Sequence, residues 1–276
     1  MEVYANMAKY IDVSSHQGTI DFNKLKGNVD GVIIRAGYGQ TNIDSQFKRN
    51  ASECNRLGIP CGAYWFSYAY NTTMAQNEAK KFIEVVKDYK MDLPLAFDYE
   101  YDSVNYATKN GVSVTVTLVK NMTNTFCQYV EKQGYYCMLY ANPDFINKYF
   151  GDLTDRYDLW LAQWPKTVDV NKPPRKCGIW QWGTSTVPGI NGGVDTNESY
   201  KDYPTYLRSI GSNHLNDKTA TQQTVINTKP TSTSTAIDYM KWARDMGLHS
   251  STNSSASVSY SELSKILYNF YQKIQK

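Results

Sequence analysis

Short apolar segments alternate with longer segments of helical periodicity through most of the chain. Eight segments are rich in β-branched and aromatic residues and bounded by turn formers, which is typical of β-strands. They are Tyr10–Val13, Gly31–Ala36, Cys61–Phe66, Leu93–Tyr99, Tyr136–Tyr140, Leu159–Trp164, Gly178–Trp182 and Gly193–Asp195. The pattern predicts a sheet of about eight strands.

Three segments between these strands predict helices: Asp44–Leu57, Asn71–Tyr89 and Ser113–Lys132. In the second, apolar residues from Ala75 to Val86 recur at helical spacing, and Asn71 or Thr72 is suited to cap its start. Strands that alternate with helices favour an α/β fold, drawn here as a (β/α) barrel. Connections after the last strands are short, so the barrel is expected to be irregular, with reduced outer helices there.

The composition changes near residue 210. We assign residues 1–210 to the barrel and 211–235, which are dominated by Ser, Thr, Asn, Gln and Lys, to a flexible linker. Residues 236–276 predict two amphipathic helices, which form a small helical module for wall binding or oligomerisation. The tail resembles one S-layer-homology repeat weakly, with Tyr260 where a basic residue is usual; a dimerising hairpin is the alternative.

Carboxylates gather in the segment LPLAFDYEYD, residues 93–102. If the segment is extended throughout, Asp98, Glu100 and Asp102 share one face at the carboxyl end of a strand, where barrel enzymes carry their chemistry. Two adjacent carboxylates repel each other, so one tends to keep a proton. A protonated acid beside a carboxylate is the pair that glycoside hydrolysis uses. Asp12 on the first strand and Asp195 on the last would approach the same mouth when the barrel closes.

Seven segments then occur in order over residues 10–200: YIDVSSHQGTIDF, GVIIRAGYG, GAYWFSYA, PLAFDYE, LYAN, LWLAQW and GIWQWGTSTVPGINGGVDTN. Together they resemble the Chalaropsis-type lysozymes, glycoside hydrolase family 25. The resemblance implies a barrel with fewer than eight outer helices and no cofactor. It also implies hydrolysis of the β-1,4 bond between N-acetylmuramic acid and N-acetylglucosamine in bacterial peptidoglycan.

The resemblance also implies roles for individual residues. Glu100 is expected to be the general acid and Asp98 the second catalytic carboxylate, while Asp12 and Asp195 orient groups and tune Glu100. His16 is expected to be a structural hydrogen-bonding residue. Substrate-binding candidates, whose alternative role is barrel packing or ion pairing, are Tyr64, Phe66, Tyr140, Trp160, Gln163, Gln181 and Arg35.

Other reaction classes fit the sequence less well. A chitinase-type barrel usually carries a further acid two residues before the Asp of its Asp-x-Glu motif, where this chain has Ala96. A wall amidase would need zinc ligands or a Cys/His pair, and the three His and five Cys form no ligand cluster. A barrel that binds glycan and has little catalytic activity is the remaining alternative. Covalent retention, retention assisted by the 2-acetamido group and inversion all use paired acids; we favour acetamido assistance.

Composition adds information about partners and location. Twenty-three Tyr and six Trp suit a carbohydrate ligand, because sugar rings stack on aromatic faces. A net charge of +3 without a basic stripe argues against nucleic acid, and no apolar stretch is long enough for a membrane span. The start shows no signal-peptide pattern. We therefore expect a phage endolysin made in the host cytoplasm and released through a holin lesion, with a bacterial autolysin as the alternative. Secondary wall polysaccharide and self-association are expected partners of the tail.

Overall fold

The computed structural model describes residues 7–216. Nine strands form one sheet in the order β1-β9-β8-β7-β6-β5-β4-β2-β3, and an additional β1–β2 pairing closes eight of them into a barrel. The short strand β3 (Asn42–Ile43) pairs with β2 alone, outside the closed ring. The strands of the closed ring are β1 (Ala8–Val13), β2 (Gly31–Tyr38), β4 (Cys61–Phe66), β5 (Leu95–Asp98), β6 (Cys137–Ala141), β7 (Asp158–Ala162), β8 (Ile179–Thr186) and β9 (Gly193–Ser199). The predicted α/β barrel is confirmed.

Seven barrel strands are parallel, and β9 runs antiparallel to both of its neighbours, β1 and β8. We call the end where the seven parallel strands finish the carboxyl rim, and the opposite end the amino end. The parallel arrangement of the first seven strands brings their last residues to the carboxyl rim. Strand β9 instead contributes its first residues to that rim.

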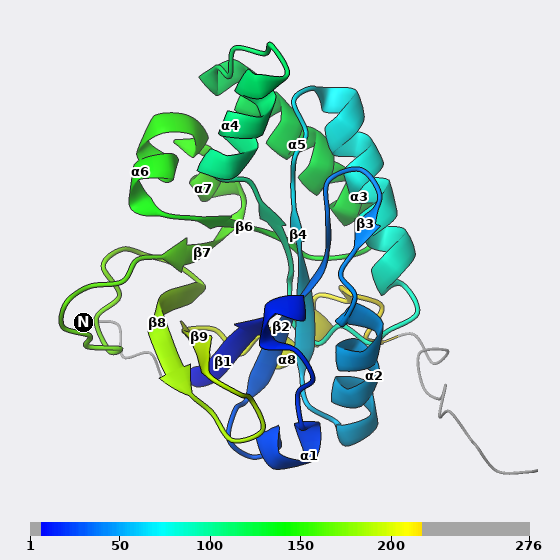
Figure 1. The fold of residues 1–276 in the computed structure, drawn as a ribbon, viewed down its shortest axis with the longest axis vertical. Helices are drawn as coiled ribbons and strands as arrows, with labels where there is room; N and C mark the ends of the chain where they lie inside the picture. Colours follow the sequence, from blue (N-terminus) through cyan, green and yellow to red (C-terminus); the bar gives the residue numbers. More distant parts are fainter. Residues whose placement is uncertain (1–6, 217–276) are drawn as a thin grey trace, which may run out of the picture. The chain divides into compact units, whose positions relative to one another are not determined.

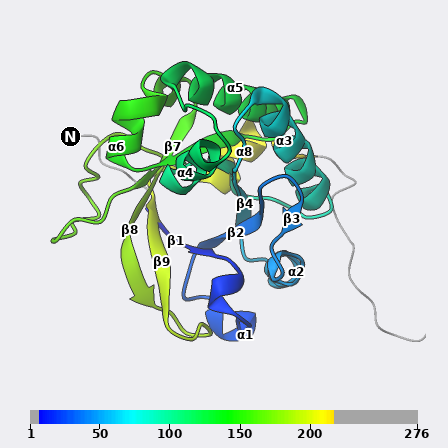
Figure 2. The same ribbon diagram turned by 45° about the horizontal axis from the view of Figure 1, so that its top comes forward.

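The longer helices cover the first part of the barrel (Figures 1 and 2). They are α2 (Phe47–Leu57), α3 (Thr72–Val86), α4 (Tyr101–Lys109) and α5 (Val116–Lys132), and the shorter ones are η1 (Ser15–Gln17), α1 (Phe22–Leu25), α6 (Pro143–Phe145), the π-helical turn η2 (Ile146–Phe150) and α7 (Leu153–Arg156). No helix follows β7 or β8, so these strands are joined to the next by loops. The predicted reduction of outer helices after the last strands is confirmed.

Local sequence explains where the helices begin and what they bury. Asn71 caps α3, because its Oδ1 accepts a hydrogen bond from the Met74 N–H at 2.8 Å, as the sequence predicted. The predicted face of α3, from Ala75 to Val86, packs on the outside of the barrel, and α5 packs beside it. A second cluster fills the inside of the barrel and includes Tyr10, Ile33, Ala96, Met138, Trp160 and Ile179.

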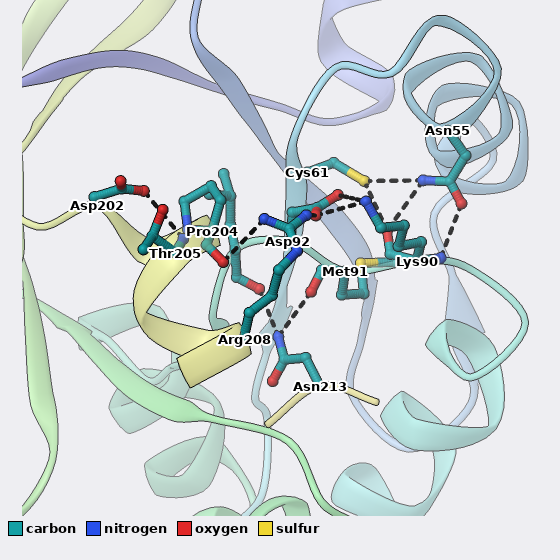
Figure 3. Close-up of polar contacts among 11 residues, drawn as sticks. Asn55, Cys61, Lys90, Met91, Asp92, Asp202, Pro204, Thr205, Arg208 and Asn213 are labelled. Carbon is teal, nitrogen blue, oxygen red and sulfur yellow. Dashed lines mark hydrogen bonds and ion pairs between the residues drawn. The ribbon is translucent and has the colours of Figure 1, made fainter. Parts of the chain in front are cut away.

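The helix α8 (Tyr203–Ser209) closes the amino end of the barrel, where Tyr203 and Leu207 join the inner cluster. Gly178 leaves room for this contact: a Cβ there would lie 1.9 Å from the Tyr203 hydroxyl, which donates to Asp158 at 2.6 Å. Figure 3 shows the polar contacts that fasten α8, in which the Arg208 guanidinium reaches Asp92 at 2.6 Å.

Asn213 fastens the chain after α8. Its amide nitrogen donates to the carbonyls of Met91 and Leu93, both at 2.9 Å (Figure 3). Its amide oxygen accepts from the Tyr136 N–H at 2.7 Å. Because Asn213 is buried in this contact, the packed domain continues to at least Asn216. Asn213, which the sequence interpretation assigned to the linker, thus packs on the barrel. The predicted module over 236–276 and most of the linker lie outside the described residues.

Candidate active site

Four acids predicted from the sequence lie at the carboxyl rim. Asp12 belongs to β1 and Asp98 ends β5, so the parallel strands deliver both to the same end. Asp195 reaches them because β9 pairs antiparallel with β1, which makes Asp12 and Asp195 direct partners in the ladder. The sequence interpretation placed Asp195 at the end of the last strand; it lies near the beginning of an antiparallel strand instead, with the same spatial result.

Glu100 is held at a turn rather than on a strand. Strand β5 ends at Asp98, and Glu100 occupies the N-cap of α4, where its N–H donates to Ser103 Oγ at 3.2 Å. The prediction of an extended segment through Asp102 is therefore wrong, because a helix begins at Tyr101. Asp102 lies in the first turn of α4 and is exposed, so it does not share the face of Asp98.

Asp98 and Glu100 form a hydrogen-bonded acid pair. Burial raises the pKa of Asp98 well above its usual range, and the negative charge of Glu100 raises it further. Burial also raises the pKa of Glu100, whose hydrogen bond with Asp98 opposes that rise. Two hydrogen-bonded carboxyls in a buried site keep one proton between them. The pair therefore offers one proton donor and one carboxylate near neutral pH.

Asp12 is buried and held by two amides. Its Oδ2 accepts from Gln181 Nε2 at 3.0 Å and from Asn197 Nδ2 at 2.9 Å. Burial, together with the charge of Asp195, raises the pKa of Asp12 to about 7, although the two amide hydrogen bonds oppose the shift. Burial also raises the pKa of Asp195. The four acids thus share a small volume, and among the described residues none of them forms an ion pair with a basic side chain.

Aromatic donors fix the orientation of both amides. Gln181 Oε1 accepts from the Tyr140 hydroxyl at 3.0 Å and from Trp164 Nε1 at 3.2 Å, which turns its NH₂ group toward Asp12. Asn197 Oδ1 accepts from Trp160 Nε1 at 2.7 Å in the same way. Each amide oxygen is occupied by a donor, so each amide nitrogen must face the carboxylate.

The predicted substrate-binding residues fall into two groups. Trp160 and Gln181 are buried, and Trp160 packs edge-on against Tyr64 and Tyr140, so it lies beneath the acids rather than at the surface. Tyr64 and Tyr140 are partly exposed at the rim. Burial raises the pKa of Tyr140 well above its usual range, and the charges of Glu100 and Asp98 add to the rise, which places its hydroxyl near the acid pair.

The remaining predicted residues lie beside the acids. Arg35 donates to Asp44 Oδ2 at 2.9 Å and to Ser15 Oγ at 3.1 Å, so it is engaged in an ion pair, as one sequence alternative allowed. Phe66 and the exposed His16 line the same pocket as Arg35. The Gln163 backbone pairs with β8, accepting from Trp180 Nε1 at 2.7 Å.

Sequence reasoning missed Asn197 and Trp164. Asn197 stands two residues after Asp195, and residues at this spacing on a strand share a face, so the signal was present. Trp164 follows β7 in a loop, where no periodicity applies. Among the described residues, no group of three His, Cys, Asp or Glu side chains is arranged to hold a metal ion. No helix in that same part of the chain is long and apolar enough to cross a bilayer.

A family model agrees with this arrangement. The model described as glycosyl hydrolases family 25 matches residues 11–190, which is more than half of the chain and includes the acids of β1 and β5 and also Glu100. The chain belongs to this family. Family 25 membership accounts for the barrel, and the fold brings Asp12, Asp98, Glu100 and Asp195 to the same rim.

Several known proteins resemble the chain. An autolytic lysozyme of Clostridium acetobutylicum is 25% identical over 69% of the chain, which spans about half (55%) of that relative's length. A family 25 glycosyl hydrolase from Bacillus anthracis is 27% identical, with a TM-score of 0.58 over 70% of this chain and 89% of its own. The modular autolysin LytC of Streptococcus pneumoniae, solved with a synthetic peptidoglycan ligand, is 30% identical, with a TM-score of 0.60 over 70% of this chain and 46% of its own.

Proposed function

We propose that the protein is a muramidase that hydrolyses the β-1,4 bond between N-acetylmuramic acid and N-acetylglucosamine in peptidoglycan. The observation that carries the proposal is the buried, hydrogen-bonded pair of Asp98 and Glu100, which holds one proton without a basic partner. Family membership and the likeness to autolytic lysozymes support the choice of substrate.

In the proposed reaction, the proton that the pair shares passes from Asp98 to Glu100 along their hydrogen bond, and Glu100 donates it to the glycosidic oxygen as the bond to C1 breaks. The carbonyl oxygen of the 2-acetamido group attacks C1 from the opposite face, at the high effective molarity of an intramolecular group. Asp98, as a carboxylate, stabilises the positive charge that develops on the acetamido nitrogen. Water then attacks C1 while Glu100 accepts its proton, which gives retention of configuration. Asp12 and Asp195 bind the sugar, and their negative charge favours the positive charge that develops on it.

The direct test uses purified cell walls. A muramidase releases new reducing ends that carry N-acetylmuramic acid and releases no free amines, whereas an amidase releases amines. Products without new reducing ends would refute the proposal. The stereochemistry is a separate test, in which ¹H NMR should show the β-anomer first. Walls chemically stripped of N-acetyl groups should be cut poorly if the acetamido group assists.

We further propose that the protein acts as an endolysin, made in the host cytoplasm and reaching the wall through a holin lesion; a bacterial autolysin of the same activity is the second candidate. Expression with and without a holin tests it, and lysis without the holin would contradict it.

Residues 236–276 are proposed to bind secondary wall polysaccharide, with self-association as the alternative role. The sequence of this segment predicts two amphipathic helices after a polar linker. A second binding module on a linker would raise the effective concentration of the enzyme at a polymeric surface. Full-length and truncated protein should differ in pelleting with walls or in sedimentation. If truncation after residue 216 changes neither, the tail has neither role.

A further inference from the structure

A pocket of about 490 Å³ lies beside the acids but is not lined by any of the four. Its size falls within the range of about 300–1,000 Å³ that is common for ligand pockets. Its walls come from the segment after β1, from β2 and β3, from the end of β4 and from α4, and its lining includes Ser15, Arg35, Tyr38, Phe66, Tyr68 and Asp102.

Residues that line the pocket are neighbours of the acid pair, both in the sequence and across the sheet. Phe66 is the direct ladder partner of Asp98, and Asp102 follows Glu100 by two residues. The positive charge of Arg35, which lines the pocket, lowers the pKa of Asp98 against the effect of burial. A polymer bound across the acids would therefore extend into this pocket.

Tyr68 is the centre of an aromatic strip that runs from the pocket onto α4. Its ring lies 5.1 Å from that of Phe66, 6.5 Å from that of Tyr38 and 5.0 Å from that of Tyr106, and Tyr106 lies 6.2 Å from Tyr70. Tyr38 is 36% exposed and Tyr106 is 42% exposed, so the outer part of the strip is not core. Polar side chains of Ser15, Ser45, His16 and Asp102 surround it.

A buried acid outside the reaction fastens this strip. Glu78 of α3 is fully buried and accepts from Ser67 Oγ at 2.5 Å, from the Tyr68 N–H at 3.1 Å and from Gln40 Nε2 at 3.1 Å. It thereby joins the turn after β2, which leads from Tyr38, to the turn after β4, which carries Tyr68. The Ser67 N–H in turn donates to the Asp98 carbonyl at 2.8 Å. The strip is thus held in fixed relation to the acid pair.

We propose that this pocket and strip form a subsite for an N-acetylhexosamine residue of the glycan strand that does not take part in the cleaved bond, with the sugar ring stacked on Tyr68 and Tyr106. Aromatic faces bind the apolar C–H faces of sugars, while the surrounding hydroxyl and carboxylate groups bind sugar hydroxyls. This inference rests on the proposed muramidase function, because it assigns an additional subsite to the same glycan substrate.

The experiment compares soluble peptidoglycan glycan fragments of increasing length. For the wild type, kcat/KM should rise with length until the subsite is filled. Tyr68→Ala should reduce the ratio of kcat/KM for long over short fragments roughly tenfold, which corresponds to the stacking of one ring. Tyr106→Ala should reduce the ratio less, and Tyr68→Phe should restore it, because the aromatic face is kept.

Tyr129→Ala is the matched control, since Tyr129 lies on α5 and packs against the core cluster outside the pocket. It should leave the ratio unchanged, and thermal unfolding of all variants checks that they are folded. An unchanged ratio in both Tyr68→Ala and Tyr106→Ala, or an equal fall in Tyr129→Ala, would overturn the subsite and leave the muramidase proposal standing. A wild type that cuts no fragment of any length would instead overturn the proposed function itself.

Discussion

The acids at the two ends of the barrel have opposite electrostatic surroundings. At the amino end, Asp92 lies 2.7 Å from Lys90 Nζ and 2.6 Å from the Arg208 guanidinium (Figure 3). Asp158, at the same end, lies 3.4 Å from Lys201 Nζ. At the carboxyl rim, the four acids have no ion pair among the described residues, and burial raises the pKa of each. The paired acids hold chain segments together at the amino end, whereas the acids at the rim have no basic partner and can keep a proton for the reaction. Acidic residues thus stabilise the fold at the amino end, whereas burial of the acids at the carboxyl rim costs stability when they are ionised.

The largest effect should follow from removing the proton donor. Glu100→Gln is nearly isosteric but cannot release a proton, so wall hydrolysis should fall by roughly 10²–10⁴-fold while folding is retained. Reducing-end release and circular dichroism measure the two parts. Asp155→Asn, which changes an exposed acid on α7, is the control and should be neutral. A loss smaller than tenfold would contradict the assignment of Glu100.

Asp12→Asn should stabilise the fold at high pH. The pKa of Asp12 rises on folding from 3.8 to about 7, so the unfolded chain loses this proton first, and stability falls as the pH rises from about 4 to 7. The amide avoids that loss and should raise the free energy of unfolding at pH 8 by up to about 4 kcal/mol, with little change at pH 4. Urea unfolding at both values measures this. A destabilised variant at pH 8 would show that the carboxylate is favourable in place.

Glu78→Gln separates the cost of burial from catalysis, because Glu78 is an unpaired buried acid outside the acid cluster. Its pKa is raised from 4.5 to about 7, chiefly by burial, so its contribution to stability also declines as the pH rises through that interval. The variant should flatten the decline and gain up to about 3 kcal/mol at pH 8. The exposed Glu84→Gln on the same helix is the control. Equal pH dependence in wild type and Glu78→Gln would contradict the expectation.

Asp92→Asn should have the smallest effect and the opposite sign. It removes the charge that pairs with Lys90 and Arg208, and because both basic side chains are about 40% exposed, the expected loss is only about 1 kcal/mol. The loss should shrink at high salt, as shown by urea unfolding at two ionic strengths. Asp169→Asn, in an exposed pair with Lys172, provides the surface reference. A stabilised Asp92→Asn would remove the difference between the two ends.

Sequence alone predicted the parts of the molecule that depend on local pattern. Strand β4 and the end of α5 at Lys132 agree with the predicted bounds, because alternation and helical spacing are local properties. The antiparallel course of β9 was not predicted, since its direction depends on the closure of the barrel rather than on its own residues.

The candidate site shows the same division. The order of the motifs located the four acids. The change from strand to helix at Glu100 coincides with a capping contact to Ser103, which hydrophobic periodicity does not predict. The amides that hold Asp12 were harder still, because Asn197 and its Trp160 partner lie far apart in sequence. The packing of Asn213 was not predicted, because a buried amide in a polar segment has the same composition as a linker.

The pairing of β1 with β9 has a consequence for synthesis of the protein. Asp12 emerges from the ribosome early, but its two amide partners lie 169 and 185 residues later in the chain. A nascent chain that has not reached β9 therefore has no closed ring and no assembled acid cluster. Contacts of such long range also form late in folding, because the intervening chain must be ordered first. Catalytic competence is consequently a property of the completed barrel, and truncated translation products that stop before β9 should be inert.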